Sequence, residues 1–378
     1  MNLFVVYPLY DITPVKGDGC YVFDAEGNKY LDLYGGHAVI SIGHSHPTYV
    51  DTISKQVQKL GFYSNSIKNP LQDKLAEKLL QASGLADYKL FLCNSGAEAN
   101  ENALKLASFH TGKSRIIYFK NAFHGRTSGA VAVTDNEAIK APFNKAHEVT
   151  CLAFEDVVSL EKELSKGDVA GVIVEIIQGV GGLDEASTEF HQATAELCSK
   201  YNAVLIADEV QSGYGRTGDF FAFQKHQISP DIISVAKGMG NGFPIGGILI
   251  SPEFEAKHGL LGTTFGGNHL ACAAGIAVLE VIENENLMQN AGELFRYVKE
   301  RTAEIPQVKI VKGRGLMLGL EFDFEVAGLR KDLLFNHKVF TGAASNKKLL
   351  RILPPLNIQK EHFEQFFSAL KAALKNKD

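Results

Sequence analysis

Short apolar runs alternate with longer helix-like stretches through the middle of the chain. The runs cover residues 90–93, 116–119, 169–175, 204–208, 232–236 and 247–250. Continuous apolar runs of this length, bounded by turn residues, are typical of strands that are buried on both faces of a parallel sheet. Their alternation with helical stretches predicts an α/β fold with a mostly parallel sheet and crossover helices.

The two ends of the chain have a different pattern. Residues 21–32 predict a short hairpin that turns at Gly27-Asn28. After about residue 270, helical runs at 270–284 and 287–305 precede apolar runs at 308–311, 315–322 and 349–352 and a last helix at 361–375. This α+β pattern predicts a smaller domain, with segments at 1–45 and 266–378, beside a large domain at 46–265.

Composition excludes several classes of protein. The chain has 378 residues, 45% of them apolar, and a net charge of −5 with no basic tail, which gives no reason to expect nucleic acid. No apolar stretch is long enough to span a membrane, and no signal peptide is visible. The five cysteines lack CxxC spacing. We therefore expect a soluble, cytoplasmic protein with buried thiols and no metal.

An acid and a lysine stand at the ends of two successive apolar runs. Asp208 ends the run 204–208, and Lys237 follows the run 232–236. Ligands of open α/β sheets bind outside the carboxyl ends of the strands, so both side chains are expected in one crevice. Burial lowers a lysine pKa and favours Schiff-base chemistry. The pair suits pyridoxal 5′-phosphate, whose ring nitrogen needs an acid and whose aldehyde needs an amine.

Two motifs follow earlier strands. In 94–100, NSGAEAN, Ser95 and Glu98 have capping-box spacing, and Gly96 lets backbone N–H groups approach a phosphate. In 121–127, NAFHGRT, a phenylalanine and an arginine suit ring stacking and carboxylate binding, and a second arginine lies in 350–356, LRILPPL. The alternatives are a capped helix, a core aromatic ring and two surface arginines.

Other motifs suggest different chemistry. Residues 107–114, ASFHTGKS, meet the loosest P-loop pattern, and 204–209 resembles a Walker B strand, so a nucleotide hydrolase is an alternative. A P-loop follows a strand and opens a helix, whereas this segment ends a predicted helix. The glycines of 238–242 follow Lys237 and do not open the first βαβ unit of the chain, so they are weak evidence for a dinucleotide-binding site. His44 and His46 lack partners with metal-ligand spacing and are interpreted as turn and helix-start residues.

The motifs together resemble the class III aminotransferases of fold type I, and are most similar to the acetylornithine aminotransferases of arginine synthesis. The resemblance extends from about Tyr7 to Ile358. It rests on NSGAEAN, NAFHGRT, LIADEVQSGYGRTG (205–218), PDIISVAKGMGNGFPIGG (230–247), GTTFGGNHLACAAG (262–275) and GRGLMLGLEF (313–322). It implies a mostly parallel seven-stranded sheet with helices on both faces, plus a smaller α+β domain.

The resemblance also implies a role for each site residue. Lys237 would bind pyridoxal 5′-phosphate and shuttle a proton, and Asp208 would keep its ring nitrogen protonated. The other cofactor contacts would be Gly96, Ala97, Phe123, Val210, Gln211 and, across a homodimer with shared active sites, Thr264. The substrate contacts would be Arg126, Thr263, Arg351 and His37.

The implied reaction moves the δ-amino group of N-acylornithine to 2-oxoglutarate, giving the N-acyl glutamate semialdehyde and glutamate. Arg126 would hold the α-carboxylate of the acylornithine, and Arg351 that of 2-oxoglutarate or glutamate. Within the same fold, the alternatives are ornithine, 4-aminobutyrate or lysine ω-aminotransferases and a glutamate semialdehyde mutase. A binding protein without activity is disfavoured, because all the chemical groups are present.

Two positions depart from the pattern of the relatives. Relatives commonly have EPIQGEGG where residues 175–182 have Glu-Ile-Ile-Gln-Gly-Val-Gly-Gly. Val180 therefore replaces the glutamate that neutralises the arginine corresponding to Arg351. His37 replaces an apolar or aromatic residue that contacts substrate. We hypothesise that the donor is N-succinylornithine, whose extra carboxylate uses His37 or Arg351.

Overall fold

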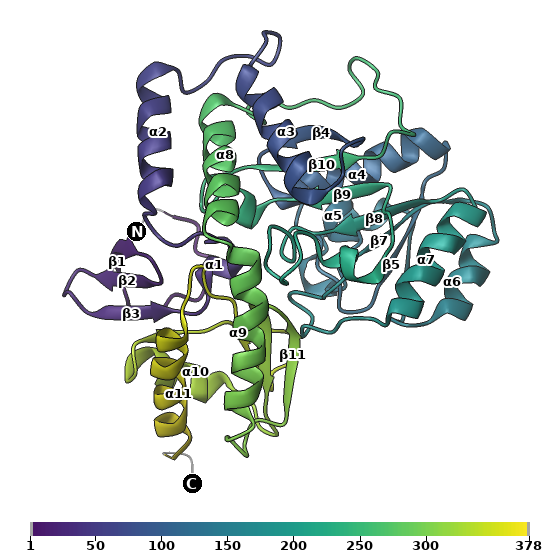
Figure 1. Cartoon of the computed structure of the whole chain (residues 1–378). Helices are drawn as coiled ribbons and strands as arrows, with labels where there is room; N and C mark the ends of the chain where they lie inside the picture. The colour runs from purple at the N-terminus through teal and green to yellow at the C-terminus, as the bar shows by residue number, and fades with distance from the viewer. Residues whose placement is uncertain (1–2, 376–378) are drawn as a thin grey trace.

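The computed structural model describes residues 3–375 and has a large sheet flanked by helices, beside a smaller layer of strands and helices (Figure 1). The large sheet has seven strands in the order β4-β10-β9-β8-β7-β5-β6. They are β4 (Lys89–Cys93), β5 (Arg115–Phe119), β6 (Val149–Leu152), β7 (Val169–Val174), β8 (Val204–Asp208), β9 (Ile232–Val235) and β10 (Gly246–Ile250). Strands β9, β8, β7, β5 and β6 are parallel, and β10 is antiparallel to both its neighbours. The predicted mostly parallel, seven-stranded sheet is confirmed.

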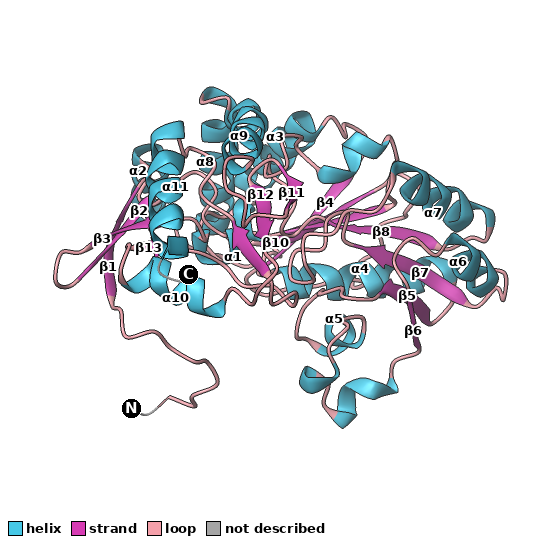
Figure 2. Ribbon diagram, turned by 90° about the horizontal axis from the view of Figure 1, so that it is seen from below, coloured by secondary structure: helices cyan, strands magenta, loops and turns pink. Residues whose placement is uncertain are grey.

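Adjacent residues of the central strands pack on opposite faces of this sheet. Ile206 of β8 belongs to a cluster with α4 (Gly96–Thr111), whereas Leu205 belongs to the cluster that includes α7 (Thr188–Lys200) and α8 (His269–Asn284). Helices lie on both sides of the strands (Figure 2). All residues of β7 and β8 are buried. Double coverage explains the continuous apolar runs, because a strand packed on both faces has no polar side.

The two ends of the chain meet in the smaller layer. One sheet consists of β1 (Pro14–Asp18), β2 (Tyr21–Asp24), β3 (Lys29–Asp32) and β13 (Val339–Phe340), and another of β11 (Ile310–Arg314), β12 (Met317–Glu321) and β14 (Leu349–Ile352). Because β13 pairs with β3, the last third of the chain is joined to the predicted N-terminal hairpin. The domain limits at residues 45 and 265 stay predictions.

The remaining helices cover these sheets or connect them. They are α1 (Gly35–Ala38), α2 (Pro47–Lys59), α3 (Pro70–Ser83), α5 (Ser128–Ala132), α6 (Val157–Leu164), α9 (Leu287–Thr302), α10 (Ala327–Phe335) and α11 (Lys360–Lys375). The short 3₁₀ helices are η1 (Glu137–Ile139), η2 (Pro142–Ala146), η3 (Ala222–His226) and η4 (Lys237–Met239). Within residues 3–375, no helix has the length and apolar character needed to cross a membrane.

Five loops leave the large sheet from the same edge. Strand β10 is antiparallel to both β4 and β9, so β4 runs in the same direction as the parallel strands. The loops that follow β4, β5, β7, β8 and β9 therefore start side by side at the carboxyl edge, where open α/β sheets bind their ligands.

Candidate functional site

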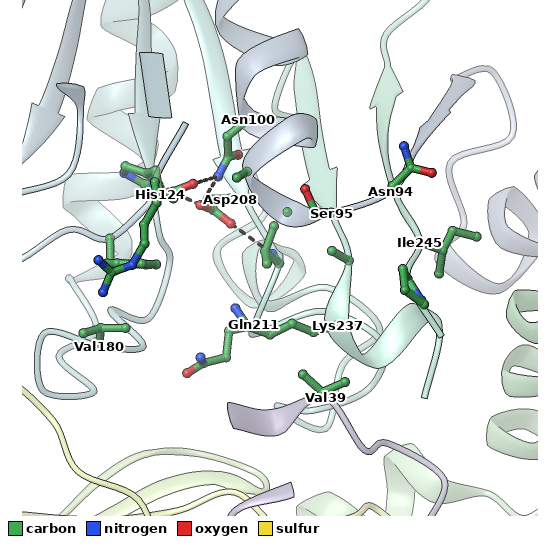
Figure 3. Close-up of a pocket in the computed structure, with 18 of the residues that line it drawn as sticks. Val39, Asn94, Ser95, Asn100, His124, Val180, Asp208, Gln211, Lys237 and Ile245 are labelled. Carbon is green, nitrogen blue, oxygen red and sulfur yellow. Dashed lines mark hydrogen bonds and ion pairs between the residues drawn. The ribbon is translucent and has the colours of Figure 1, made fainter. Parts of the chain in front are cut away.

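A cavity of about 440 Å³ lies at this edge of the sheet (Figure 3). All five of these loops contribute to its wall. It contains these predicted site residues: Gly96, Ala97, Phe123, Arg126, Asp208, Val210, Gln211 and Lys237. The structure therefore brings together side chains and backbone groups that are far apart in the sequence.

Asp208 is buried at the end of β8 and is held by three hydrogen bonds. Its Oδ2 accepts from Nδ1 of His124 at 2.7 Å and from Nδ2 of Asn100 at 2.8 Å, and its Oδ1 accepts from the Val210 N–H at 3.0 Å. Burial opposes ionisation, but the His124 contact, the charge of Lys237 and the Val210 N–H together lower the pKa of Asp208 below its ordinary value. A carboxylate is thus stabilised in a dry part of the cavity.

Lys237 follows β9, and its backbone has a strained conformation. Its φ of +45° lies in the left-handed region, which side chains other than glycine adopt only when the surroundings enforce it. Burial lowers the pKa of the Lys237 amine, while Asp208 and Glu175 act in the opposite direction. Within residues 3–375, this amine forms no ion pair with a carboxylate, so it stays available at the cavity wall.

The N-terminus of α4 presents free backbone donors to the cavity. The Ser95 hydroxyl accepts from the Glu98 N–H at 3.2 Å, as the capping spacing predicts. The Glu98 carboxylate, however, accepts from the backbone and side chain of Asn94 at 2.8 and 2.9 Å and not from Ser95. The first N–H groups of a helix have no partner inside it, so those of Gly96 and Ala97 remain for an anion.

Gly96 is required by its close approach to Val210, in the loop after β8. A Cβ at this position would lie 2.6 Å from Cγ1 of Val210, which is too close for a real contact. The backbone at the start of α4 and the side chain of Val210 are therefore in close contact. A side chain at residue 96 would move one of them.

The side chain of Gln211 indicates whether the cavity suits the predicted cofactor. Its Oε1 is buried and has no hydrogen-bond partner among the described residues. An unpaired buried polar atom costs free energy unless a ligand supplies the missing partner. A hydroxyl on a ring between Val210 and Phe123 would do so, with the ring nitrogen toward Asp208 and the phosphate toward Gly96. The residues present fit pyridoxal 5′-phosphate.

Two guanidinium groups, Arg126 on the cavity wall and Arg351 beside it, have no carboxylate partner in the described part of the chain. Arg126 is exposed at the cavity wall. Arg351, in β14, is buried; its Nη1 donates to the Gly179 carbonyl at 2.5 Å, and its Nε has no partner among residues 3–375. Burial lowers the pKa of Arg351. Val180 lies on the cavity wall beside Gly179 and contributes no charge.

Four predicted residues are not part of the cavity wall: Arg351, described above, His37, Thr263 and Thr264. His37 has a φ of +68° and a ring nitrogen 2.6 Å from the Tyr34 hydroxyl. Burial, together with the charges of Arg351 and Lys237, lowers the pKa of His37, so at neutral pH it offers a neutral ring and no positive charge. The Thr263 hydroxyl is 3.3 Å from Nδ2 of Asn94.

Thr264 is the last of these residues, and its side chain is exposed. Thr264 is not part of the cavity wall of its own chain.

Sequence reasoning missed three groups in the cavity. His124, within the NAFHGRT segment, is buried against Asp208. Asn100 lies four residues after Gly96, and this spacing places both on one face of α4. Glu175 follows β7 directly, as Asp208 ends β8. The spacing and the strand-end position were the available signals.

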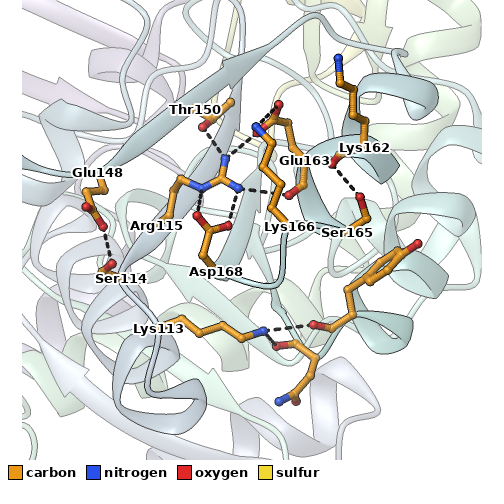
Figure 4. A network of polar contacts seen from close by, with 12 residues as sticks. Lys113, Ser114, Arg115, Glu148, Thr150, Lys162, Glu163, Ser165, Lys166 and Asp168 are labelled. Carbon is orange, nitrogen blue, oxygen red and sulfur yellow. Dashed lines mark hydrogen bonds and ion pairs between the residues drawn. The ribbon is translucent and has the colours of Figure 1, made fainter.

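The nucleotide-hydrolase alternative is contradicted by the segment 107–114. It ends α4 and precedes β5, so it cannot form a P-loop. Its lysine and serine are also occupied: Nζ of Lys113 donates to the carbonyls of Tyr201 and Asn202 at 3.1 and 2.7 Å, and Ser114 donates to Glu148 (Figure 4).

The cysteines and the two histidines have local structural roles. All five cysteines are free thiols; four are buried, and Cys151 is only half-buried. His44 pairs with Asp32, and His46 pairs with Glu285, each at 2.8 Å.

Known proteins of similar sequence are also aminotransferases. The aminotransferase class-III family profile matches residues 6–374. The chain is 40% identical to acetylornithine aminotransferase from Bacillus subtilis over 99% of this chain and 97% of that protein. It is 41% identical to acetylornithine aminotransferase from Aquifex aeolicus over 95% of this chain and 96% of the relative. The chain belongs to the class-III aminotransferases.

Solved structures of similar proteins share the fold. An ornithine aminotransferase from Toxoplasma gondii ME49 superposes with a TM-score of 0.92 and 27% identity, over 99% of this chain and 93% of that one. Acetylornithine aminotransferase from Elizabethkingia anophelis has a TM-score of 0.86 and 29% identity, over 99% and 96%. Another Toxoplasma gondii ornithine aminotransferase structure has pyridoxal 5′-phosphate at partial occupancy in its active site. The fold predicted for this class-III aminotransferase is thereby confirmed.

Proposed function

We propose that this class-III aminotransferase uses pyridoxal 5′-phosphate to move the δ-amino group of an N-acylornithine to 2-oxoglutarate, in arginine biosynthesis in the cytoplasm. The observation that carries this proposal is the pairing, in one cavity, of a free lysine amine with a carboxylate that is kept ionised despite burial. The more similar relatives are acetylornithine aminotransferases. They favour an acylated donor over free ornithine, 4-aminobutyrate or lysine.

Lys237 and Asp208 carry the chemistry in this proposal. The cofactor, when bound, supplies an electron sink for the carbon that loses a proton. Lys237 would hold the cofactor through its amine, and the same amine would move the proton from the substrate carbon. Asp208 keeps a proton on the ring nitrogen, because an ionised acid in a dry site stabilises the positive charge opposite it. His124 and Asn100 hold that acid in place.

The other cavity residues hold the cofactor. Gly96 and Ala97 donate backbone N–H groups to the phosphate. Val210 and Phe123 would cover the two faces of the ring, and Oε1 of Gln211 would accept from the ring hydroxyl. Because one bound cofactor would serve the two substrates in turn, ping-pong kinetics are expected.

A homodimer would complete the site with Thr264 of the second subunit. Support comes from the exposed apolar surface next to it. Phe265 is 60% exposed and lies against Phe62, which is 42% exposed, with the ring centroids 5.4 Å apart. Large exposed aromatic pairs are typical of protein interfaces. Light scattering of the purified protein measures the mass and tests this part.

The two unpaired guanidinium groups match the carboxylates of the substrates. Arg126 would bind the α-carboxylate of the acylornithine, with Thr263 nearby, and Arg351 that of 2-oxoglutarate. Charge-assisted bonds to a planar guanidinium are strong and directional. Arg126→Ala is therefore expected to raise KM for the acylornithine more than it weakens cofactor binding.

The acyl group is proposed to be succinyl. Among residues 3–375, Arg351 has no carboxylate partner, and the apolar Val180 stands where relatives commonly have a glutamate, so a second negative charge on the donor has a place to bind. The lowered pKa of His37 favours Arg351 over His37 for this task. A ratio of kcat/KM that strongly favours acetylornithine over succinylornithine rejects the succinyl proposal.

Steady-state kinetics on a donor panel test the function as a whole. The panel contains acetylornithine, succinylornithine, ornithine, 4-aminobutyrate, lysine and glutamate 1-semialdehyde, each with and without 2-oxoglutarate. The proposal requires an acylated ornithine to be the best donor and turnover to depend on 2-oxoglutarate. Turnover of the semialdehyde without a keto acid would identify a mutase instead.

A further inference from the structure

Glu175 is a buried carboxyl group in the cavity, and the proposed reaction assigns it no task. It directly follows β7, is 6% exposed and lies on the cavity wall. Its Oε1 accepts from the Phe123 N–H and its Oε2 accepts from the Gly179 N–H, each at 2.9 Å. One side chain therefore fastens the loop after β5 to the loop after β7.

The backbone of Gly179, which is bonded to Glu175, also contacts two other site residues. Its carbonyl accepts from Nη1 of Arg351. A Cβ on Gly179 would lie 2.3 Å from Oε1 of Gln211, so the glycine backbone packs directly against that side chain. The carboxyl group of Glu175 thus fixes the position of the Gly179 backbone. This backbone contacts both Arg351, the proposed keto-acid arginine, and Gln211, the proposed partner of the ring hydroxyl.

A carboxylate is the appropriate side chain here because both of its partners are donors. A glutamine has one acceptor oxygen, so it could satisfy only one of the two N–H groups and would point an NH₂ group at the other. The charge is costly at this position, since burial and then Asp208 raise the pKa of Glu175 to about 7, against the effect of His124 and of the two N–H groups.

We propose, on the basis of the aminotransferase function above, that Glu175 is a positioning residue that couples the cofactor wall to the keto-acid arginine. It holds Phe123 against the ring and, through Gly179, holds Arg351 at the distance that the α-carboxylate of 2-oxoglutarate requires. Glu175 touches no reacting atom in this scheme. It acts on both half-reactions by fixing the two loops relative to each other.

Glu209 offers a matched control. It is also buried at a strand end, 1% exposed, and burial raises its pKa to about 7. Its Oε1 accepts from the Phe223 N–H at 2.9 Å, but its Oε2 accepts from the Ser212 hydroxyl at 2.6 Å. A hydroxyl rotates and accepts as readily as it donates, so glutamine fits here and not at Glu175. Glu209 is not part of the cavity wall.

The test compares Glu175→Gln with Glu209→Gln as cofactor-loaded enzymes. Each substrate is titrated in steady state, and each half-reaction is followed in a single turnover by the cofactor absorbance. Glu175→Gln is expected to raise KM for 2-oxoglutarate about tenfold, the size of one lost buried hydrogen bond to a charged group. Cofactor affinity is expected to fall as well. Glu209→Gln is expected to leave KM for 2-oxoglutarate within about twofold of wild type, because its bonds are kept.

Equal KM values for 2-oxoglutarate in the two variants would overturn the positioning role, as would a fall in kcat alone. If Glu175→Gln does not fold, Glu175→Asp is used, since it keeps two acceptors at a shorter reach; it must show the same rise in KM. An unmutated enzyme that transfers no amino group to 2-oxoglutarate from any donor would instead reject the proposed function, so the two failures are distinct.

Discussion

Replacing Asp208 by asparagine changes one atom and removes one charge in a side chain that is bonded on both oxygens. Oδ2 accepts from His124 and Asn100, and Oδ1 accepts from the Val210 N–H. Whichever position the new NH₂ group takes, it faces at least one N–H donor. The asparagine therefore loses a hydrogen bond and also loses the negative charge that the ring nitrogen of the cofactor would need.

The two losses have different sizes and different readouts. A buried donor left without its acceptor costs about 1–3 kcal/mol, which should appear as a lower free energy of unfolding of the cofactor-free protein. Removing a preorganised charge from a dry active site typically costs 10²- to 10³-fold in kcat, or about 2.7–4 kcal/mol. Asp208→Asn is therefore expected to bind the cofactor and to be slower by about 10²- to 10³-fold in proton abstraction.

The assay is a single-turnover donor half-reaction, with denaturant unfolding of the same preparation. Asn100→Ala is the control, because it removes one bond to Oδ2 and keeps the charge on Asp208. It should slow the reaction by about tenfold or less. A turnover of Asp208→Asn within about threefold of wild type would refute the role of Asp208 as the charged partner of the ring, given the size normally lost. Equal losses in both variants would show that geometry matters and charge does not.

Three further predictions concern single positions. Lys237→Ala should abolish transamination and the visible absorbance of the bound cofactor, measured by activity and spectroscopy. Gly96→Ala should weaken cofactor binding, seen in a titration, because its Cβ would lie 2.6 Å from Val210 and overpacking costs about 1–3 kcal/mol. Burial raises the pKa of Glu209 from 4.5 to about 7, so the unfolded chain ionises first and the stability due to this group falls as pH rises between those values. Glu209→Gln should remove that fall, about 3 kcal/mol between pH 4.5 and pH 8 in denaturant unfolding; an unchanged slope contradicts it.

The positions of Asp208 and Lys237 could be predicted from the sequence because they depend on local pattern. A strand covered on both faces is a continuous apolar run, and the first polar residue after it must lie at the edge of the sheet. The same reasoning locates residues 94–97 and 123–126. The seventh strand, β6, was not among the predicted runs because it lies at the end of the sheet, where three of its four residues are only half-buried.

The missed contacts are those that join distant segments. His124 and Asn100 are 84 and 108 residues away from Asp208. The loop after β7 reaches Arg351 across 172 residues. The local pattern of a loop does not indicate which strand end the loop will contact, because this contact depends on the order of the strands in the sheet. The reversed direction of β10 is a further feature of this kind.

The charges of the cavity explain why the protein should be most stable with its ligands bound. Lys237 is half-buried and Arg351 is buried; burial lowers the pKa of both groups, and neither forms an ion pair with a carboxylate among residues 3–375. An unpaired buried charge is costly, and an anion that binds beside it recovers part of that cost. A ligand that binds only the folded state stabilises it by mass action. Phosphate at Gly96 and carboxylate at Arg351 should therefore raise the unfolding temperature separately. Inorganic phosphate and 2-oxoglutarate, added alone and together, test this, and a stabilisation by 2-oxoglutarate that survives Arg351→Ala would contradict the assignment.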